Sequence, residues 1–221
     1  MRLLPGVISY SYPGNIHEPL YFSLIGINFF TPSSRNDDVI VLEHFSDILE
    51  RDSHLPGYIS KKFTKNNRLM FRFQTFNISG LGTSQLHVLG WNAYRNGSLN
   101  KITQNMLNTF EFIGENGIDE KVLKQHKKYK LLKNYQDGYR YSYIAKQLGN
   151  AEIINGDYRF YDRKIEILKN LSNEDIKRVV NKYLISDNMA TFQLSINKKP
   201  WYNPIISFIV NQIILRFWKS Q

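Results

Sequence analysis

The chain has 221 residues, of which 42% are hydrophobic and 14% aromatic, so we expect one globular domain with a substantial buried core. It contains no cysteine, which excludes disulfides, iron–sulfur clusters, thiolate zinc sites and a cysteine nucleophile. The formal charge of +10 is compatible with nucleic acid, an anionic membrane or an acidic partner, and it selects none of them.

Residues 1–20 hold three prolines and two glycines, which predict turns and a lead-in to the domain. No apolar segment followed by a small-residue cleavage site is found there, so we expect no secretory signal. A cytoplasmic or organelle-matrix location fits this pattern best.

Residues 21–30 form an apolar run of strand length, and residues 37–51 place apolar side chains at helical spacing. Val41 and Phe45 fall on one face of that helix, and Asn36 or Asp37 can accept hydrogen bonds from the N–H groups of its first turn. We therefore predict a strand followed directly by a helix.

Residues 68–77 and 84–92 alternate apolar and polar side chains, which predicts two adjacent antiparallel strands. Helical spacing predicts four further helices, at residues 99–113, 119–149, 159–170 and 172–184. Alternating apolar and polar residues predict a closing strand at 188–196. The 119–149 helix would bend or break at Asp137-Gly138, and its predicted inward residues are Val122, His126, Tyr129, Leu132, Tyr135 and Tyr139. The 172–184 helix opens with a near capping box, and the closing strand is predicted to face the core with Ala190, Phe192, Leu194 and Ile196.

The C-terminal segment 204–218 is apolar on most sides but too short to cross a bilayer as a helix. It needs a surface to lie against, which is its own domain, a partner chain or a membrane surface. The candidate contact residues in this segment are Phe208, Ile213, Phe217 and Trp218.

The order of elements predicts an α+β fold, a single roll in which several helices cover one face of a largely antiparallel sheet. We divide the chain into a lead-in at 1–20, the roll at 21–197 and an apolar C-terminal helix at 198–221.

Several motifs in this order resemble the pitrilysin/insulinase-type zinc metallopeptidases, which include the mitochondrial processing peptidase. They are the Asp-Asp start of the first helix and its Ile48-Leu49 end, Asn116-Gly-Ile-Asp-Glu120, Ala145-Lys-Gln-Leu148, Gly156-Asp157 and the segment Leu171 to Leu184. The resemblance covers about residues 20–197. It implies a working unit of two facing rolls, of which the first carries zinc and the second closes the chamber and grips the peptide.

The resemblance also implies where zinc would bind, in an inverted H-x-x-E-H motif on a helix. The matching window here is Ile40-Val-Leu-Glu-His44, so an isoleucine stands at the first ligand position. Glu120 lies where a third ligand would be, but His44 and Glu120 alone are too few for a tight site. We therefore expect no catalytic residue and no metal in this chain, with Glu43 and His44 a chance match to the motif on the helix surface.

The second roll of the family supplies an Arg and, seven positions later, a Tyr that grip the peptide. Thr64 and Phe71 match these positions, and neither keeps the hydrogen-bonding group; Lys62 or Lys65 would substitute only with a shift in register. The candidate peptide-binding residues of this segment are Thr64, Arg68, Phe71, Arg72 and Phe73.

Other chemistries find little support. The sequence has no G-x-S-x-G, P-loop or G-x-G-x-x-G motif, and the remaining histidines are isolated, as expected of turn, surface or core residues. Tyrosines interleave with cations at residues 133–146, as in some single-stranded nucleic-acid binders, but no RNA-binding signature accompanies them. This argues against nucleic acid as the partner.

The sequence thus favours a non-catalytic roll that pairs with a zinc-bearing roll on another chain in a peptide-processing heterodimer, with zinc in the partner chain. It would bind an extended peptide by strand addition at residues 68–77. The alternative is a structural subunit that has lost peptide binding and docks through 204–218 to a larger assembly or a membrane surface. A self-sufficient protease is the third hypothesis, and it requires an unforeseen metal site.

Overall fold

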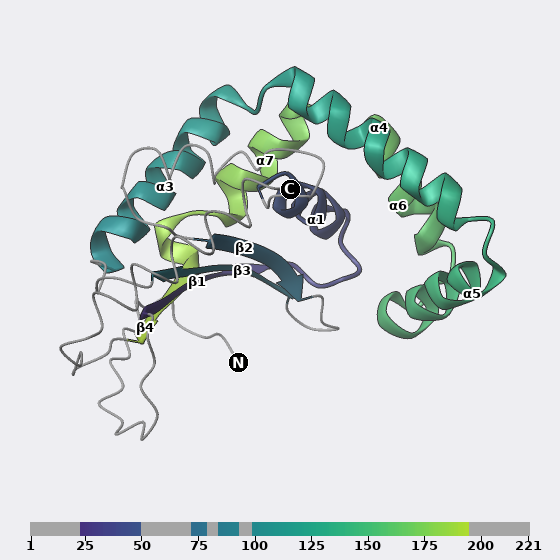
Figure 1. Ribbon diagram of the computed structural model, residues 1–221, viewed down its shortest axis with the longest axis horizontal. Helices are drawn as coiled ribbons and strands as arrows, with labels where there is room; N and C mark the ends of the chain where they lie inside the picture. Colours follow the sequence, from purple (N-terminus) through teal and green to yellow (C-terminus); the bar gives the residue numbers. More distant parts are fainter. Residues whose placement is uncertain (1–22, 50–71, 79–83, 93–98, 195–221) are drawn as a thin grey trace, which may run out of the picture.

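The structure, a computed structural model, describes residues 23–49, 72–78, 84–92 and 99–194 (Figure 1). The strands are β1 (Ser23–Thr31), β2 (Arg72–Ile78), β3 (Ser84–Asn92) and β4 (Met189–Leu194). The helices are α1 (Asp37–Leu49), α3 (Leu99–Asn116), α4 (Glu120–Asp137), α5 (Tyr141–Asn150), α6 (Phe160–Asn170) and α7 (Asn173–Tyr183), with a π-helix η1 (Ala151–Asn155) and a 3-10 turn η2 (Ser186–Asn188). The predicted lead-in and C-terminal helix lie outside these residues.

The four strands form one sheet in the order β2-β3-β1-β4, and every neighbouring pair is antiparallel. Figure 1 shows α1, α3 and α7 on one side of this sheet, while α4 arches away and carries α5 and α6 beyond it. The predicted α+β roll, with helices covering one face of the sheet, is therefore confirmed.

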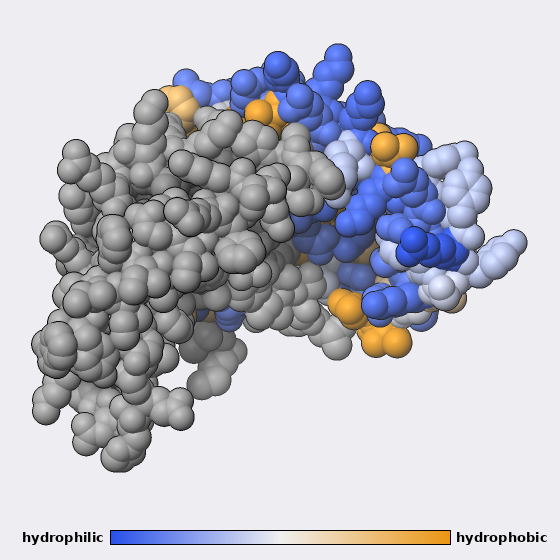
Figure 2. Space-filling view, in the orientation of Figure 1, coloured by the Kyte–Doolittle hydropathy of each residue, from blue (hydrophilic) through white to orange (hydrophobic). Residues whose placement is uncertain are grey.

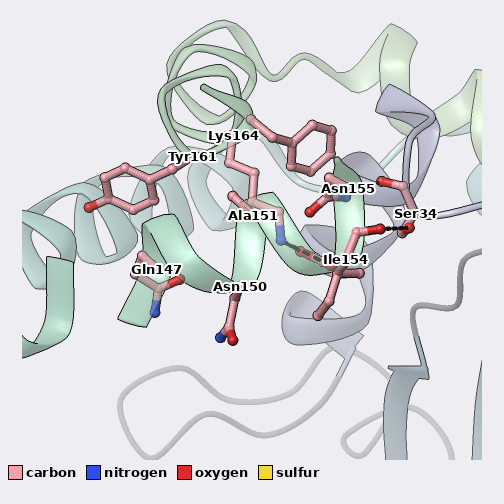
Figure 3. Close-up of a pocket in the computed structure, with 10 residues that line it drawn as sticks. Ser34, Gln147, Asn150, Ala151, Ile154, Asn155, Tyr161 and Lys164 are labelled. Atoms are coloured by element: carbon pink, nitrogen blue, oxygen red, sulfur yellow. Dashed lines mark hydrogen bonds and ion pairs between the residues drawn. The ribbon is translucent and has the colours of Figure 1, made fainter. Parts of the chain in front are cut away.

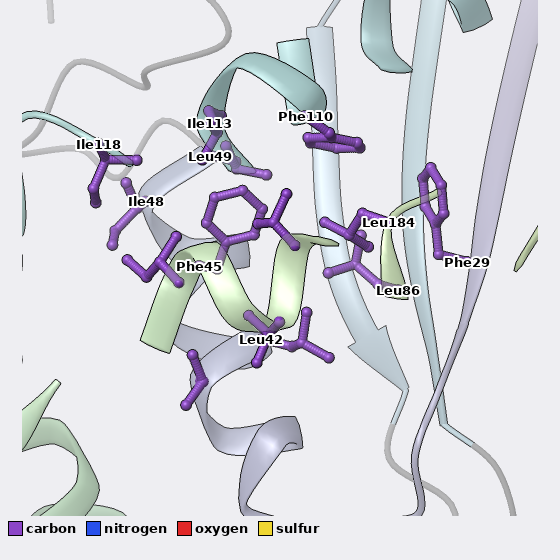
Figure 4. Packing of buried hydrophobic residues seen from close by; sticks show 14 of the residues in the cluster. Phe29, Leu42, Phe45, Ile48, Leu49, Leu86, Phe110, Ile113, Ile118 and Leu184 are labelled. Atoms are coloured by element: carbon purple, nitrogen blue, oxygen red, sulfur yellow. The ribbon is translucent and has the colours of Figure 1, made fainter. Parts of the chain in front are cut away.

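The core lies between the sheet and the helices that cover it (Figure 4). Phe29 of β1 packs edge-on against Phe110 of α3, with ring centroids 5.5 Å apart, and Phe45 of α1 packs on the other side of Phe110 at 6.1 Å. All three are fully buried. Burying each such ring contributes about 1.5–3 kcal/mol, so this contact orients α1 and α3 on the sheet.

Helix α1 forms where the sequence predicted it, because its start is capped and one face is apolar. The Asn36 side chain accepts a hydrogen bond from the Asp38 N–H at 2.9 Å, which satisfies a first-turn donor. Val41, Phe45 and Ile48 are buried in the core, as predicted. The capping box of α7 is also present, with the Ser172 side chain accepting from the Asp175 N–H.

The long helix predicted for 119–149 is broken into α4 and α5 at Gly138, as its Asp137-Gly138 pair suggested. Its predicted inward face is partly wrong. His126 is buried, but Leu132, Tyr135 and Tyr139 are 52%, 66% and 70% exposed. The reason is that the chain from the C-terminal half of α4 onward extends past the main core, where α6 covers only part of it. Figure 2 shows the resulting hydrophilic surface, with isolated apolar residues, over the part of the molecule that contains α4 and α5.

The closing strand is in the predicted place, but its inward face is the opposite one. Met189 and Thr191 are buried and pair with Phe29 and Ile27 of β1 on the helix-covered face. Phe192 therefore points to the other face, where it covers Gly26. Because side chains alternate strictly along a strand, a shift of one residue in the assignment reverses every orientation.

Candidate functional site on helix α1

The first position of the H-x-x-E-H window is filled by a fully buried apolar side chain. Ile40 is 0% exposed and packs with Ala151 of η1 and Phe160 of α6. An imidazole at this position would sit in an apolar cluster, and isoleucine offers no ligand atom. The window therefore does not fit the zinc ion that the motif holds in catalytic rolls.

Glu43 occupies the position of the catalytic base in this motif, and a lysine neutralises it. The Lys164 ammonium of α6 lies 3.0 and 3.3 Å from the two carboxylate oxygens of Glu43. Both residues line a cavity of about 180 Å³ between α1 and the α5–η1–α6 segment, seen from close by in Figure 3. A carboxylate held by an ammonium is poorly placed to take a proton from a metal-bound water.

His44, the one histidine of the window, meets a second histidine from α4. Its Nδ1 atom lies 3.3 Å from the Nε2 atom of His126, and the two rings are nearly perpendicular, with centroids 5.4 Å apart. Burial lowers the pKa of His44 to about 3, and the charges of His126, Lys130 and Lys164 add to this effect. His44 is therefore a neutral imidazole at physiological pH.

Asp47, one turn after His44, completes a group of three metal-ligating side chains. One ligand atom each from His44, Asp47 and His126 can be chosen so that all lie within 4.8 Å of one another. Lys130 also reaches this group, with its ammonium 2.7 Å from an Asp47 oxygen. The structure thus assembles a partly buried cluster of opposite charges and imidazoles between α1 and α4.

The third ligand suggested by the sequence is not part of this group. The Glu120 carboxylate, at the start of α4, accepts a hydrogen bond from Asn173 at 2.6 Å. His126, taken from the sequence as an isolated core residue, is the side chain that meets His44 instead. In the sequence, the apolar stripe of the predicted 119–149 helix correctly placed His126 on the inward face. It could not show that the residue opposite would be His44.

The predicted peptide-binding residues are only partly within the described chain. Arg72 and Phe73 lie at the start of β2, which is one end of the described four-stranded sheet. Thr64, Arg68 and Phe71 lie outside the described residues, as do Lys62 and Lys65. The contact residues proposed in 204–218 lie outside them too.

Comparison of the sequence with protein-family models and with curated proteins finds no match. Solved structures, in contrast, match the fold. A Helicobacter pylori protease superposes with a TM-score of 0.73 at 14% identity, covering 86% of this chain and 44% of the protease. The peptidase M16 inactive domain from Pseudomonas fluorescens gives 0.64 at 15% identity, covering 88% of this chain and 44% of that one. An inactive peptidase domain from Bordetella parapertussis gives 0.63 at 18% identity, covering 80% and 92%.

The chain therefore has the fold of an M16-type peptidase roll, which confirms the resemblance drawn from the sequence motifs. It spans less than half the length of the Helicobacter pylori protease that it matches. Within the described residues, no helix combines the length and the apolar character required to cross a membrane.

Proposed function

We propose that this chain is a non-catalytic roll that pairs with a zinc-bearing pitrilysin-type roll on another chain and completes a peptide-processing heterodimer. The observation that carries the proposal is the buried Ile40 at the first zinc-ligand position, in a fold shared with domains described as inactive peptidases. The hydrolytic zinc would then be held by the partner chain.

The ion pair between Glu43 and Lys164 supports the same proposal. Hydrolysis by an inverted zinc motif needs a free carboxylate next to the metal-bound water. In this chain the equivalent carboxylate is engaged by an ammonium at 3.0 Å. Two of the motif's three functional side chains are thus missing or neutralised.

The contribution of this chain would be to close the chamber and bind an extended peptide at β2. Strand addition requires a sheet edge with free backbone N–H and C=O groups, since these supply the binding energy. In the described part of the sheet, β2 pairs with β3 on one side only. Arg72 and Phe73 would then flank the bound peptide.

Co-expression with candidate zinc-bearing rolls tests this proposal. We expect a stable complex that cleaves extended peptides, whereas neither chain alone does so. Disrupting the partner's zinc motif should abolish cleavage, and Glu43→Gln in this chain should leave it unchanged. Cleavage that persists after the partner's motif is disrupted would contradict the proposal.

The same experiment addresses the structural-subunit alternative. A stable complex that neither cleaves nor binds peptide would favour a subunit that kept the roll and lost peptide binding. Docking to a membrane surface through 204–218 is then tested with lipid vesicles. The cytoplasmic or organelle-matrix location remains a prediction.

A further inference from the structure

Three metal-ligating side chains meet where α4 crosses α1. His44 and Asp47 project from successive turns of α1, and His126 comes from α4, 82 residues after His44. His126 is 2% exposed, so its imidazole is held in place by the surrounding protein. The group shares His44 with the inverted-motif window but uses neither Ile40, Glu43 nor Glu120, so its set of ligands differs from that of the motif.

The spacing of the two imidazoles suits a tetrahedral metal ion. With metal–nitrogen bonds of about 2.0–2.1 Å, two ligand atoms of a tetrahedral site lie about 3.3–3.4 Å apart. The observed distance between His44 Nδ1 and His126 Nε2 is 3.3 Å. A metal ion could therefore replace the proton between the rings without separating the two helices.

The third ligand lies on the same side. Residues three apart on a helix share a face, so Asp47 projects next to His44. One of its carboxylate oxygens lies within 4.8 Å of a ring nitrogen of each histidine, so Asp47 is the carboxylate ligand of the group. Two imidazoles and one carboxylate are ligands that favour zinc and its first-row neighbours.

We propose that His44, Asp47 and His126 bind a divalent transition-metal ion, zinc in the cell, which fastens α4 to α1. The role is structural, because the Glu43 carboxylate nearby is already engaged by Lys164. The site would fix the start of the arm formed by α4 and α5, which Figure 1 shows extending away from the sheet.

Lys130 would compete with the metal ion for the Asp47 carboxylate. Its ammonium lies 2.7 Å from an Asp47 oxygen and occupies the place of a cation. The Lys130 and Asp47 side chains are 24% and 39% exposed, so the lysine can turn into solvent when a metal binds. Because a partly exposed ion pair stabilises by about 0.2–1 kcal/mol, removing Lys130 should tighten metal binding by about 1.4- to fivefold.

Cobalt titration of the untagged, chelator-treated chain tests the proposal, since tetrahedral Co²⁺ absorbs visible light. We expect one Co²⁺ per chain, displaced by zinc, and tighter binding by the Lys130→Ala variant. Asp47→Asn should weaken binding about tenfold or more. Zinc should also raise the melting temperature of the wild type but much less that of Asp47→Asn.

The control is His87→Gln, which removes a histidine of β3 that contacts Asn28, on the face of the sheet away from the helices. It should leave cobalt binding unchanged. Asp47 and Lys130 are used as test positions because replacing the buried His126 endangers folding. The proposal is overturned if neither the wild type nor Lys130→Ala binds cobalt, or if Asp47→Asn binds it as tightly as the wild type. None of these readouts needs a partner or a peptide, so the outcome is independent of the proposed function.

Discussion

The hydroxyl of Tyr183 donates a hydrogen bond of 2.7 Å to the carboxylate of Asp38, 145 residues earlier in the chain. Asp38 lies in the first turn of α1 and is buried, and Tyr183 is the last residue of α7. Arg178 and Lys182 of α7 also bond to this carboxylate. The start of α1 is thereby tied to the side of α7, next to the window that holds Ile40, Glu43 and His44.

Asp38→Asn should destabilise the fold by about 2 kcal/mol, because it removes the charge that three α7 side chains contact. The loss stays below that of a fully buried pair, since Arg178 and Lys182 reach solvent and can be rehydrated. Urea denaturation measures the effect. Asp162→Asn, at an exposed position of α6, is the matched control and should change stability by less than about 0.5 kcal/mol. Equal effects of the two substitutions would contradict the role assigned to Asp38.

The Asp38 carboxylate also leads us to predict that the free energy of unfolding falls in acid. Burial raises the pKa of Asp38, but the hydrogen bonds from Arg178, Tyr183 and Lys182 outweigh it, so the pKa lies below the ordinary value of 3.8. A carboxyl whose pKa is lower in the folded state stabilises the fold fully above the unfolded pKa. That contribution disappears as the pH falls through the folded pKa.

The stability difference between wild type and Asp38→Asn should therefore be constant from about pH 7 to pH 5 and shrink below about pH 4. Taking the difference isolates Asp38, because the acid-dependent contribution of His44, which burial holds neutral, is the same in both proteins. Urea denaturation at stepped pH values measures it. A difference that grows in acid would show that the Asp38 pKa is raised instead.

We predict that Gly26 of β1 and Phe192 of the neighbouring strand β4 are sterically coupled. A Cβ atom on Gly26 would overlap the Phe192 ring, which covers it from the neighbouring strand. Gly26→Ala should thus destabilise the fold by about 1–3 kcal/mol, and much less in a Phe192→Ala background. Gly149→Ala, whose Cβ would meet nothing within 4 Å, should be neutral or slightly stabilising. Equal costs of Gly26→Ala in the two backgrounds would refute the coupling.

This contact also shows where sequence reasoning succeeded and failed. Strand β3, helix α7 with its cap and the buried face of α1 were predicted because each has a local signal, either a strict period or a capping residue. The face of β4 was not, because Ala190 and Phe192 are the more apolar pair and yet Met189 and Thr191 face the helices; only the pairing with Phe29 and Gly26 of β1 decides this. A local pattern cannot contain that pairing.

The candidate site likewise has features that the sequence predicted and features that it did not. The loss of the first ligand was visible at Ile40, because the motif lies within five consecutive residues. The meeting of His44 with His126 was not visible, since it depends on how α4 crosses α1 after 82 intervening residues. The Lys164 partner of Glu43 was missed for the same reason, at a separation of 121 residues.

Restoring the missing ligand should not create a protease. Ile40→His places an imidazole among Ala151 and Phe160, and losing this packing while burying a polar ring should cost about 2–4 kcal/mol. Urea denaturation and cleavage of a fluorogenic peptide are the measurements, with Ile153→His, at a position 77% exposed, as the control for stability. We expect a less stable chain without cleavage. Zinc-dependent cleavage by Ile40→His alone would show that Glu43 is available as a base despite Lys164.

Peptide binding at β2 predicts slower hydrogen exchange of its edge amides. Because successive backbone N–H groups of a strand point to opposite sides, strand addition should protect alternate residues of β2 by about tenfold or more. The measurement compares the heterodimer with and without an extended, uncleavable peptide. The amides of β3, paired on both sides, should exchange equally in both samples and serve as the internal reference. Protection at β4 instead would show that the peptide binds at the opposite edge of the sheet. Protection nowhere in the described strands would favour the structural-subunit alternative.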